Sequence, residues 1–459
     1  MIRRLHAPVA MLPDEWARDV LIEIGSDGDI ASVTPGSPRG DAEDAGGPVI
    51  PGMSNLHSHA FQRAMAGLAE RMGSPEDSFW TWREVMYRFL SRLTPEDCHA
   101  IASQLYVEML RNGYTAVAEF HYLHNDPAGR PYADRAEMSL AHVRAAREAG
   151  IAITHLPSLY AHATFGAAPL KPTQIRFATR PEDVLEIVRR VRGAYRDDAD
   201  VRVGVAPHSL RAVSAPLLAA LLSGLDEVAP TAPIHIHAAE QTKEVDDCIA
   251  WSGLRPVEWL LANAGADERW CLVHCTHMTP DETRELARRR AVAGLCPTTE
   301  GNLGDGIFPL RDYLAAGGHF GIGGDSHVSQ SPVEELRWME YVQRLRHQRR
   351  NIAASEARPS VGATLWRRAL EGGSRALGRA MGVISPGARA DLLVLDGEHP
   401  NLAGREGDGI LDALVFAGNE RLVRHVAVSG NWVVRDGRHA DEPAIAERYK
   451  RVVARLLAP

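Results

Sequence analysis

Residues 54–59 read Ser54-Asn55-Leu56-His57-Ser58-His59 and place two histidines at the end of a short apolar stretch. Side chains two positions apart on an extended segment point to the same face, so both imidazoles can reach one metal ion. Two histidines at this spacing also arise by chance on exposed strands. The pair therefore predicts a metal site only if other strands supply further ligands.

Three further stretches each end an apolar run with a polar side chain. Residues 234–240, IHIHAAE, alternate isoleucine with histidine and end in Glu240; we assign His237 to the site and His235 to ordinary packing. Residues 271–274, CLVH, end in His274, and residues 321–325, GIGGD, end in Asp325. Glycines in the last stretch let the backbone approach the site closely. Each stretch alone is more often structural than catalytic, but their order along the chain is specific.

The middle of the chain alternates short apolar runs with longer amphipathic stretches, which is the pattern of repeated βα units. Helices are predicted at 136–149 and 181–195, and candidate strands end near residues 56, 120, 156, 206, 237, 274, 296 and 323. Eight strands close a (β/α)8 barrel, whose active site lies at the C-terminal ends of the strands. The predicted fold class is α/β, with a (β/α)8 TIM barrel over residues 51–383.

Short strand-like runs also occur near both ends of the chain, at residues 19–24, 390–396 and 423–432. Neither end is long enough to build a hydrophobic core alone. We therefore predict that residues 1–50 and 384–459 pair into one small composite β-sandwich domain.

Composition restricts the classes of partner. The chain has 459 residues, 45% of them hydrophobic, and its net charge of -8 is spread along the sequence. The absence of a polybasic tract argues against nucleic acid or an anionic membrane surface as a partner. With no apolar run of about 18 residues and no signal peptide pattern, we expect a cytoplasmic protein that does not span a membrane. The five cysteines form no CxxC pair and are expected to be mostly buried, reduced thiols.

His57, His59, His237, His274 and Asp325 lie on the first, fifth, sixth and eighth candidate strands. In this arrangement, and in residues 385–396, SPGARADLLVLD, the chain resembles the amidohydrolase superfamily over nearly its whole length. The resemblance implies a homodimeric hydrolase with one Zn²⁺ per chain, bound by His57, His59, His237 and Asp325. Residues 201–206 contain no lysine that could be carbamylated to bridge two metals, so we expect a mononuclear site. Iron and other ions of similar ligand preference remain alternatives to zinc.

Longer stretches are similar to one family of that superfamily, the formimidoylglutamate deiminases. They are residues 54–67 (SNLHSHAFQRAMAG), 78–84 (SFWTWRE), 118–122 (AEFHY), 208–211 (HSLR) and 302–309 (NLGDGIFP). This resemblance implies hydrolysis of N-formimino-L-glutamate to N-formyl-L-glutamate and ammonia, in histidine degradation. The small-molecule substrate carries two carboxylates, which Arg83 and Arg211 are predicted to bind because the arginine fork fits a carboxylate bidentately. The resemblance adds Gln62, Tyr122 and His208 to the substrate-binding set.

The implied mechanism uses a zinc-bound water whose pKa the metal lowers to about 7, so that hydroxide attacks the formimino carbon. The departing ammonia must be protonated, and Glu240 is the candidate proton shuttle. The resemblance implies that Asp325 accepts a proton from the water and that His274 orients the nucleophile or the developing charge, although these roles are exchangeable. Trp80 and Trp82 are expected to be packing residues of a loop over the site.

Two alternatives stay open. A deaminase of the same superfamily acting on a cyclic amidine, such as a purine or pterin, would use the same chemistry, but its pocket would need aromatic stacking and amide hydrogen bonds. A catalytically inactive barrel would show gaps in the metal-binding set, and none of the ligands is missing from the sequence.

Overall fold

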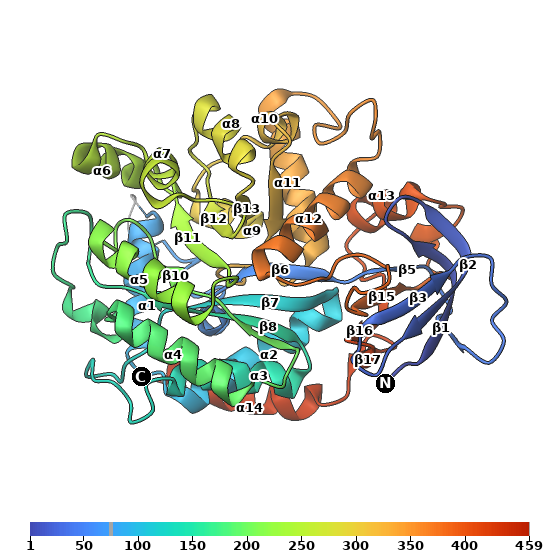
Figure 1. Cartoon of the computed structure of the whole chain (residues 1–459), viewed down its shortest axis with the longest axis horizontal. Helices are drawn as coiled ribbons and strands as arrows, with labels where there is room; N and C mark the ends of the chain where they lie inside the picture. The colour runs from blue at the N-terminus through green and yellow to red at the C-terminus, as the bar shows by residue number, and fades with distance from the viewer. Residues whose placement is uncertain (73–76, 459) are drawn as a thin grey trace.

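The structure is a computed structural model that describes residues 1–72 and 77–458 (Figure 1). Within these ranges no helix is both long and apolar enough to cross a lipid bilayer. The same ranges contain all five cysteines, and each is buried and outside any disulfide, as predicted.

The predicted alternation of strands and helices is present in the middle of the chain. Its strands are β6 (Met53–Ser58), β7 (Tyr114–His121), β8 (Ala152–Leu159), β9 (Val201–Val203), β10 (Ala206–Pro207), β11 (Ile234–Ala238), β12 (Trp270–His274), β13 (Val292–Leu295) and β14 (His319–Ile322). The short strands β9 and β10 together occupy the place of the fourth predicted strand. Every residue of β7 and β8 is buried, as expected for parallel strands covered on both faces.

These parallel strands form two sheets that are linked at both edges. One sheet has the order β10-β8-β7-β6, with β9 paired to β8, and the other has the order β11-β12-β13-β14. A bridge between Val205 and Ile234 joins them at one edge, and a bridge between Ser58 and Asp325 joins them at the other. The fold class is therefore the predicted (β/α)8 type, and the second link brings the end of β6 beside Asp325.

Helices surround the strands (Figure 1). The α-helices of this region are α1 (Phe79–Leu90), α2 (Pro95–Asn112), α3 (Glu137–Ala149), α4 (Pro181–Ala194), α5 (Ala215–Val228), α6 (Thr242–Ser252), α7 (Pro256–Trp259), α8 (Pro280–Arg289), α9 (Pro297–Leu303), α10 (Leu310–Ala315), α11 (Pro332–His347) and α12 (Val361–Leu377). Short 3-10 helices η1 (Ala60–Met65) and η2 (Pro172–Phe177) and the π-helix η3 (Leu260–Ala264) lie between them. Helices α3 and α4 match the two predicted helices; α3 ends at Gly150, whose φ of 78° suits a left-handed cap.

Helix α12 packs against both β6 and β14, the two strands that precede metal-ligand candidates. The approach is close because Gly372 and Gly373 face the strands: a Cβ atom at Gly372 would overlap the carbonyl oxygen of Phe320, and one at Gly373 would overlap the Ser54 hydroxyl. Glycine in a helix interior normally costs about 0.5–1 kcal/mol relative to alanine. Here the close contact of helix and sheet requires it.

Replacing Gly372 with alanine is therefore expected to destabilise the protein by about 1–3 kcal/mol or more, because the clash is with backbone that cannot move aside. Gly193, an exposed glycine in α4 with no atom within 4 Å of its virtual Cβ, provides the matched control. Gly193→Ala should keep or raise the melting temperature, and Gly372→Ala should lower it in a thermal denaturation experiment. Equal melting temperatures for the two variants would contradict the packing argument.

The ends of the chain meet in one sheet, shown at the right of Figure 1. Its strands are β1 (Arg4–Met11), β2 (Trp16–Ile24), β3 (Ile30–Thr34), β4 (Glu43–Asp44), β5 (Val49–Pro51), β15 (Leu392–Leu395), β16 (Val423–Val428), β17 (Asn431–Arg435) and β18 (Arg438–His439). The order is β18-β17-β16-β15-β5-β1-β2-β3, with β4 paired to β1. Strand β5 thus joins the N-terminal strands to the C-terminal ones, and the predicted pairing of the two ends is present.

The sheet has its own hydrophobic core, which includes Leu5, Ile22 and Leu392. Helix α13 (Asp408–Phe416) and the 3-10 helix η4 (Pro400–Leu402) lie between β15 and β16. The last helix, α14 (Glu442–Leu457), packs against α2 of the barrel. Since the C-terminal segment contacts both parts, the division into residues 1–50 with 384–459 and residues 51–383 stays a prediction.

Candidate active site

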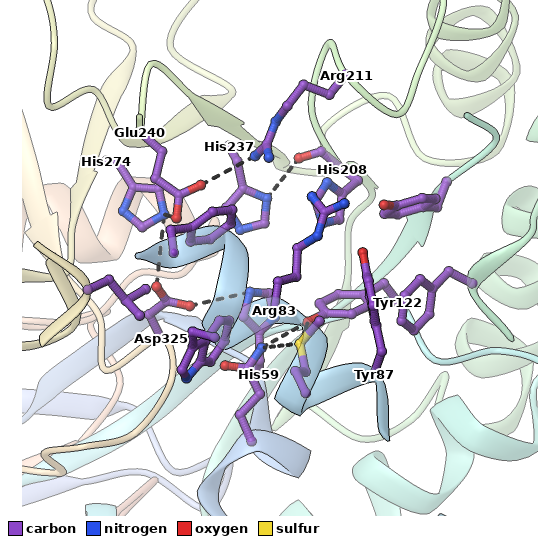
Figure 2. Close-up of a pocket in the computed structure, with 17 residues that line it drawn as sticks. His59, Arg83, Tyr87, Tyr122, His208, Arg211, His237, Glu240, His274 and Asp325 are labelled. Carbon is purple, nitrogen blue, oxygen red and sulfur yellow. Dashed lines mark hydrogen bonds and ion pairs between the residues drawn. The ribbon is translucent and has the colours of Figure 1, made fainter. Parts of the chain in front are cut away.

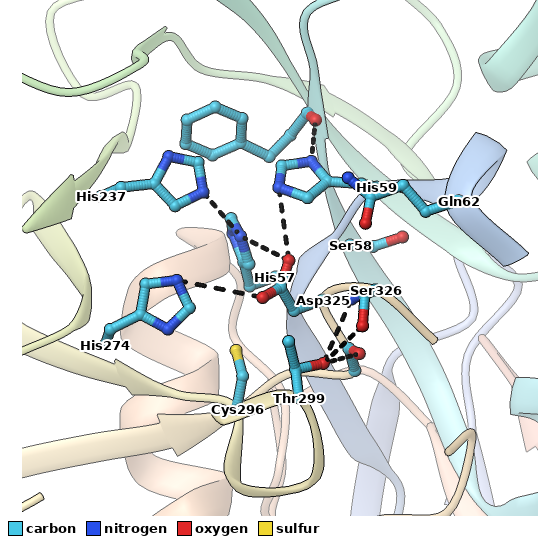
Figure 3. Close-up of polar contacts among 12 residues, drawn as sticks. His57, Ser58, His59, Gln62, His237, His274, Cys296, Thr299, Asp325 and Ser326 are labelled. Carbon is cyan, nitrogen blue, oxygen red and sulfur yellow. Dashed lines mark hydrogen bonds and ion pairs between the residues drawn. The ribbon is translucent and has the colours of Figure 1, made fainter. Parts of the chain in front are cut away.

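Four predicted metal ligands converge where strands end (Figure 3). The Nε2 atom of His57 lies 3.1 Å from Nε2 of His237. The Oδ1 atom of Asp325 lies 3.4 Å from Nε2 of His59 and 3.5 Å from Nε2 of His57. All four side chains are buried. Asp325 comes shortly after β14 and has a left-handed φ of 47°. It lies beside His57 of β6 and His59, which follows that strand.

The protonation of the histidines fits a cation at this point. Nδ1 of His59 donates to the Phe120 carbonyl (2.7 Å), and Nδ1 of His237 donates to the His208 carbonyl (2.8 Å). Burial lowers the pKa of His57 to about 3 and also lowers the pKa of His59 and His237, so the rings are neutral at pH 7. The lone pair on Nε2 of His59 therefore faces the carboxylate of Asp325, and that of His237 faces Nε2 of His57. Such a cluster is typical of a divalent metal site with nitrogen and oxygen ligands.

Glu119, a residue of β7, holds the segment that carries His57 and His59. The carboxylate of Glu119 accepts hydrogen bonds from the Ser58 hydroxyl (2.6 Å) and the Ala60 backbone N–H (2.8 Å). Because neighbouring residues of a strand point to opposite faces, Glu119 lies outside the barrel while Phe120 faces the site. These bonds fix the backbone on both sides of His59.

Glu240, on the loop after β11, and His274, the last residue of β12, lie beside the same cluster. Nε2 of His274 is 3.7 Å from Oε1 of Glu240 and 3.9 Å from Oδ2 of Asp325. Burial favours a neutral His274 ring, but the carboxylate of Glu240 and a hydrogen bond to Glu300 raise the pKa of His274 to about 10. Burial also raises the pKa of Glu240. Glu240, His274 and Asp325 can therefore hold and exchange protons at the candidate metal site.

Two arginines also line the pocket (Figure 2). Nη2 of Arg211 lies 3.3 Å from Oε2 of Glu240 and 3.9 Å from Oε2 of Glu244. The guanidinium of Arg83, on α1, lies over the rings of Trp80 (5.2 Å) and Tyr87 (5.3 Å). The pocket is therefore lined both by candidate metal ligands and by two cationic side chains.

The remaining predicted residues also line this pocket. The amide of Gln62, in η1, donates to the hydroxyl of Tyr122 (2.8 Å). Tyr122 directly follows β7 and His208 directly follows β10. His235, which we predicted to be a packing residue outside the site, is buried and donates to the carbonyl of Ala376 (2.8 Å).

Some features of the pocket were missed by sequence reasoning. Trp80 and Trp82 belong to helix α1, not to a loop, and Trp82 lines the pocket while Trp80 stacks with Arg83. The pocket residues that we did not predict are Phe79, Met86, Tyr87, Tyr160, Phe177 and Leu303. Tyr160 directly follows β8, so its place at a strand end was a usable signal, whereas Phe177 reaches the pocket from η2 and carries no local signal.

Comparison with known proteins agrees with the site. Residues 49–433 match the model of the amidohydrolase family, and residues 2–47 match the model described as formimidoylglutamate deiminase HutF, N-terminal domain. A formimidoylglutamate deiminase from Pseudomonas aeruginosa is 56% identical over 454 residues, covering 99% of each chain.

Solved structures show the same fold. The crystal structure of an amidohydrolase from Brucella melitensis has a TM-score of 0.94 at 46% identity and covers 99% of this chain and 100% of its own. An adenosine deaminase from Xanthomonas campestris with bound zinc has a TM-score of 0.81 at 20% identity, covering 99% and 98% of the two chains, and is similar in fold alone. The chain thus belongs to the amidohydrolase family of metal-dependent hydrolases, in the branch that includes the formimidoylglutamate deiminases.

Proposed function

We propose that this protein hydrolyses N-formimino-L-glutamate to N-formyl-L-glutamate and ammonia, as a step of histidine degradation. The observation that carries the proposal is a pocket lined both by the candidate metal ligands His59, His237 and Asp325 and by Arg83 and Arg211. The metal ligands suit hydrolysis of a formimino group, and the arginines suit a dicarboxylate. The 56% identity to the Pseudomonas aeruginosa formimidoylglutamate deiminase supports the same substrate.

The metal proposed for the site is a single zinc ion held by His57, His59, His237 and Asp325. Three imidazoles and one carboxylate are a usual ligand set for zinc, and residues 201–206 offer no lysine to bridge a second ion. When bound, the zinc supplies Lewis-acid activation of water at neutral pH.

The protein side chains would then handle the protons. Asp325 would accept a proton from the attacking water, and His274 would orient that water or the developing charge. Glu240, beside His274, would shuttle the proton to the nitrogen that leaves as ammonia. This delivery is required because an unprotonated amide anion is too poor a leaving group. The separation of 3.7 Å between Glu240 and His274 supports transfer within this pair.

Recognition of the glutamate part is assigned to the two arginines with Gln62, Tyr122 and His208. The Nε atom of Arg211 is buried and makes no hydrogen bond among the described residues, and the same holds for Oε1 of Gln62. Polar atoms left unpaired in a buried position are costly unless a ligand satisfies them. A substrate carboxylate on Arg211 and a substrate donor at Gln62 would do so.

Ammonia release from a panel of substrates tests the proposal. We expect N-formimino-L-glutamate to be the preferred substrate, simple formamidines to react poorly, and guanine not to react. Preferred release from guanine or another cyclic amidine would overturn the dicarboxylate assignment. No release from any of the three, with the metal bound, would favour an inactive barrel.

The metal prediction is tested by replacing His237 with alanine, which removes one of four ligands and should greatly reduce both metal content and activity. Elemental analysis of purified protein should find one active-site ion per chain in the parent. The matched control is His235→Gln, two residues earlier on β11, because His235 is buried and bonds to Ala376 instead. A His237→Ala variant with full metal and activity would exclude His237 as a ligand.

We expect the protein to be cytoplasmic. We also expect it to be a homodimer. Light scattering of the purified protein measures its mass, and a monomer would contradict that expectation.

A further inference from the structure

His274 needs a partner to set the direction of its ring. It ends β12 with a φ of 73°, and Cys275 follows with a φ of 51°, so two successive non-glycine residues have left-handed backbone. This turn aims the ring into the pocket, but rotation of the ring about its own bonds would still exchange the positions of its nitrogens. The buried Nε2 atom makes no hydrogen bond among the described residues, because Glu240 and Asp325 lie 3.7 and 3.9 Å away, beyond hydrogen-bond distance.

Glu300, a buried residue of α9, lies on the other side of the ring. Its Oε1 atom accepts a hydrogen bond from Nδ1 of His274 (3.3 Å). The same oxygen accepts the backbone N–H of Cys296 (3.0 Å). With Nδ1 held in this way, Nε2 must face Glu240 and Asp325.

We propose that Glu300 is a positioning residue that acts through His274, holding its ring so that Nε2 points at Glu240 and Asp325. The proposal rests on the proposed function, because it assumes that His274 takes part in the hydrolysis. Glu300 itself faces away from the reacting atoms and is not among the residues that line the pocket.

The short helix that carries Glu300 is firmly anchored. The backbone N–H and hydroxyl of Thr298 both donate to the carboxylate of Glu335 on α11 (2.9 and 2.6 Å). The hydroxyl of Thr299 donates to the carbonyl of Gly324 (3.1 Å), the residue before Asp325. One helix therefore holds the partner of His274 and contacts the turn that carries Asp325, which suits a role in fixing their relative position.

The first test compares Glu300→Leu with Glu300→Gln. Leucine removes the acceptor, so kcat should fall by about 10- to 100-fold, the usual effect of losing a partner that orients a functional side chain. Glutamine keeps an acceptor oxygen and should restore part of the loss. KM and metal content should stay within about twofold of the parent for both variants, since Glu300 contacts neither substrate nor metal ligands. Equal loss in the two variants, or a loss confined to KM, would overturn the proposal.

A double-mutant cycle decides whether the effect passes through His274. In a His274→Asn background, Glu300→Leu should cause no further loss of kcat. A loss as large as in the parent background would show that Glu300 acts elsewhere. Glu335→Gln is the matched control, because Glu335 is a buried carboxylate that supports the same helix. We expect it to lower the melting temperature, and any change in kcat should be independent of His274.

A crystal structure of Glu300→Leu separates this inference from the proposed function. We expect the His274 ring to rotate or to adopt several orientations, even if the protein acts on a different amidine. A ring that keeps Nε2 toward Glu240 and Asp325 would overturn the positioning role. Failure of the parent to release ammonia from N-formimino-L-glutamate would instead reject the proposed function. The orientation of the His274 ring in Glu300→Leu would then still test the positioning role of Glu300.

Discussion

Replacing Glu240 with glutamine is expected to lower kcat by about 10²- to 10⁴-fold while the metal stays bound. The carboxylate of Glu240 is buried next to His274, and glutamine has nearly the same shape. Its neutral amide, however, cannot carry the proton that the departing ammonia requires. Steady-state kinetics together with elemental analysis measure both parts of this expectation.

Glu282→Gln is a suitable control for removing a buried carboxylate. Glu282 pairs with Arg255 (2.8 Å) outside the pocket, so its loss should reduce stability and leave kcat per bound metal close to that of the parent. If Glu240→Gln lost less than about tenfold, well below the range for general acid–base assistance, another group would have to carry the proton.

Replacing Arg83 or Arg211 with methionine is expected to reduce kcat/KM for N-formimino-L-glutamate by about 30- to 5,000-fold. This range corresponds to the ~2–5 kcal/mol that truncating one partner of a buried charge pair usually costs. The loss should appear in kcat/KM because contacts remote from the reacting carbon position it at the metal. Kinetics on the substrate and on a small neutral formamidine, which makes no carboxylate contact, separate recognition from chemistry.

The structure makes Arg83 the cleaner of the two positions. Arg211 also contacts Glu240 at 3.3 Å, so its removal leaves His274 as the ionic partner of Glu240 and is expected to slow the neutral formamidine as well. Arg83 lies against Trp80 and Tyr87, and Arg83→Met should leave the neutral substrate unchanged. Arg83→Lys, which keeps the charge but loses the bidentate fork, should fall between the parent and Arg83→Met.

Parent-like hydrolysis of N-formimino-L-glutamate by both methionine variants would reject the dicarboxylate pocket and favour a cyclic amidine. Equal losses on both substrates in Arg83→Met would indicate a damaged fold or metal site.

The strands and the residues at their ends were predictable because their signals are local. An extended chain repeats every two residues, so the spacing of His57 and His59 and the alternation in residues 234–237 follow from strand geometry. The (β/α)8 order then places the ends of successive strands on one face, and this brings His57, His59, His237, His274 and Asp325 together.

The same reasoning failed where a side chain reaches the pocket from another part of the chain. Helix α1 carries Phe79 and Trp82 into the pocket after β6, and nothing in their local pattern separates a helix from a loop there. Phe177 comes from η2, far from any strand end. Such contacts depend on how helices pack on the barrel, which involves residues distant in sequence.

The sequence by itself determined the α/β barrel, the joining of both chain ends and the set of candidate ligands, because hydrophobic periodicity and strand-end position are short-range properties. Only the tertiary structure decided the pairing of Arg211 with Glu240 and of His274 with Glu300. Arg211 and Glu240, 29 residues apart, meet because they follow β10 and β11, whose sheets are joined by the bridge between Val205 and Ile234. His274 and Glu300, 26 residues apart, meet because β12 and β13 pair in one parallel sheet. No local pattern encodes either approach.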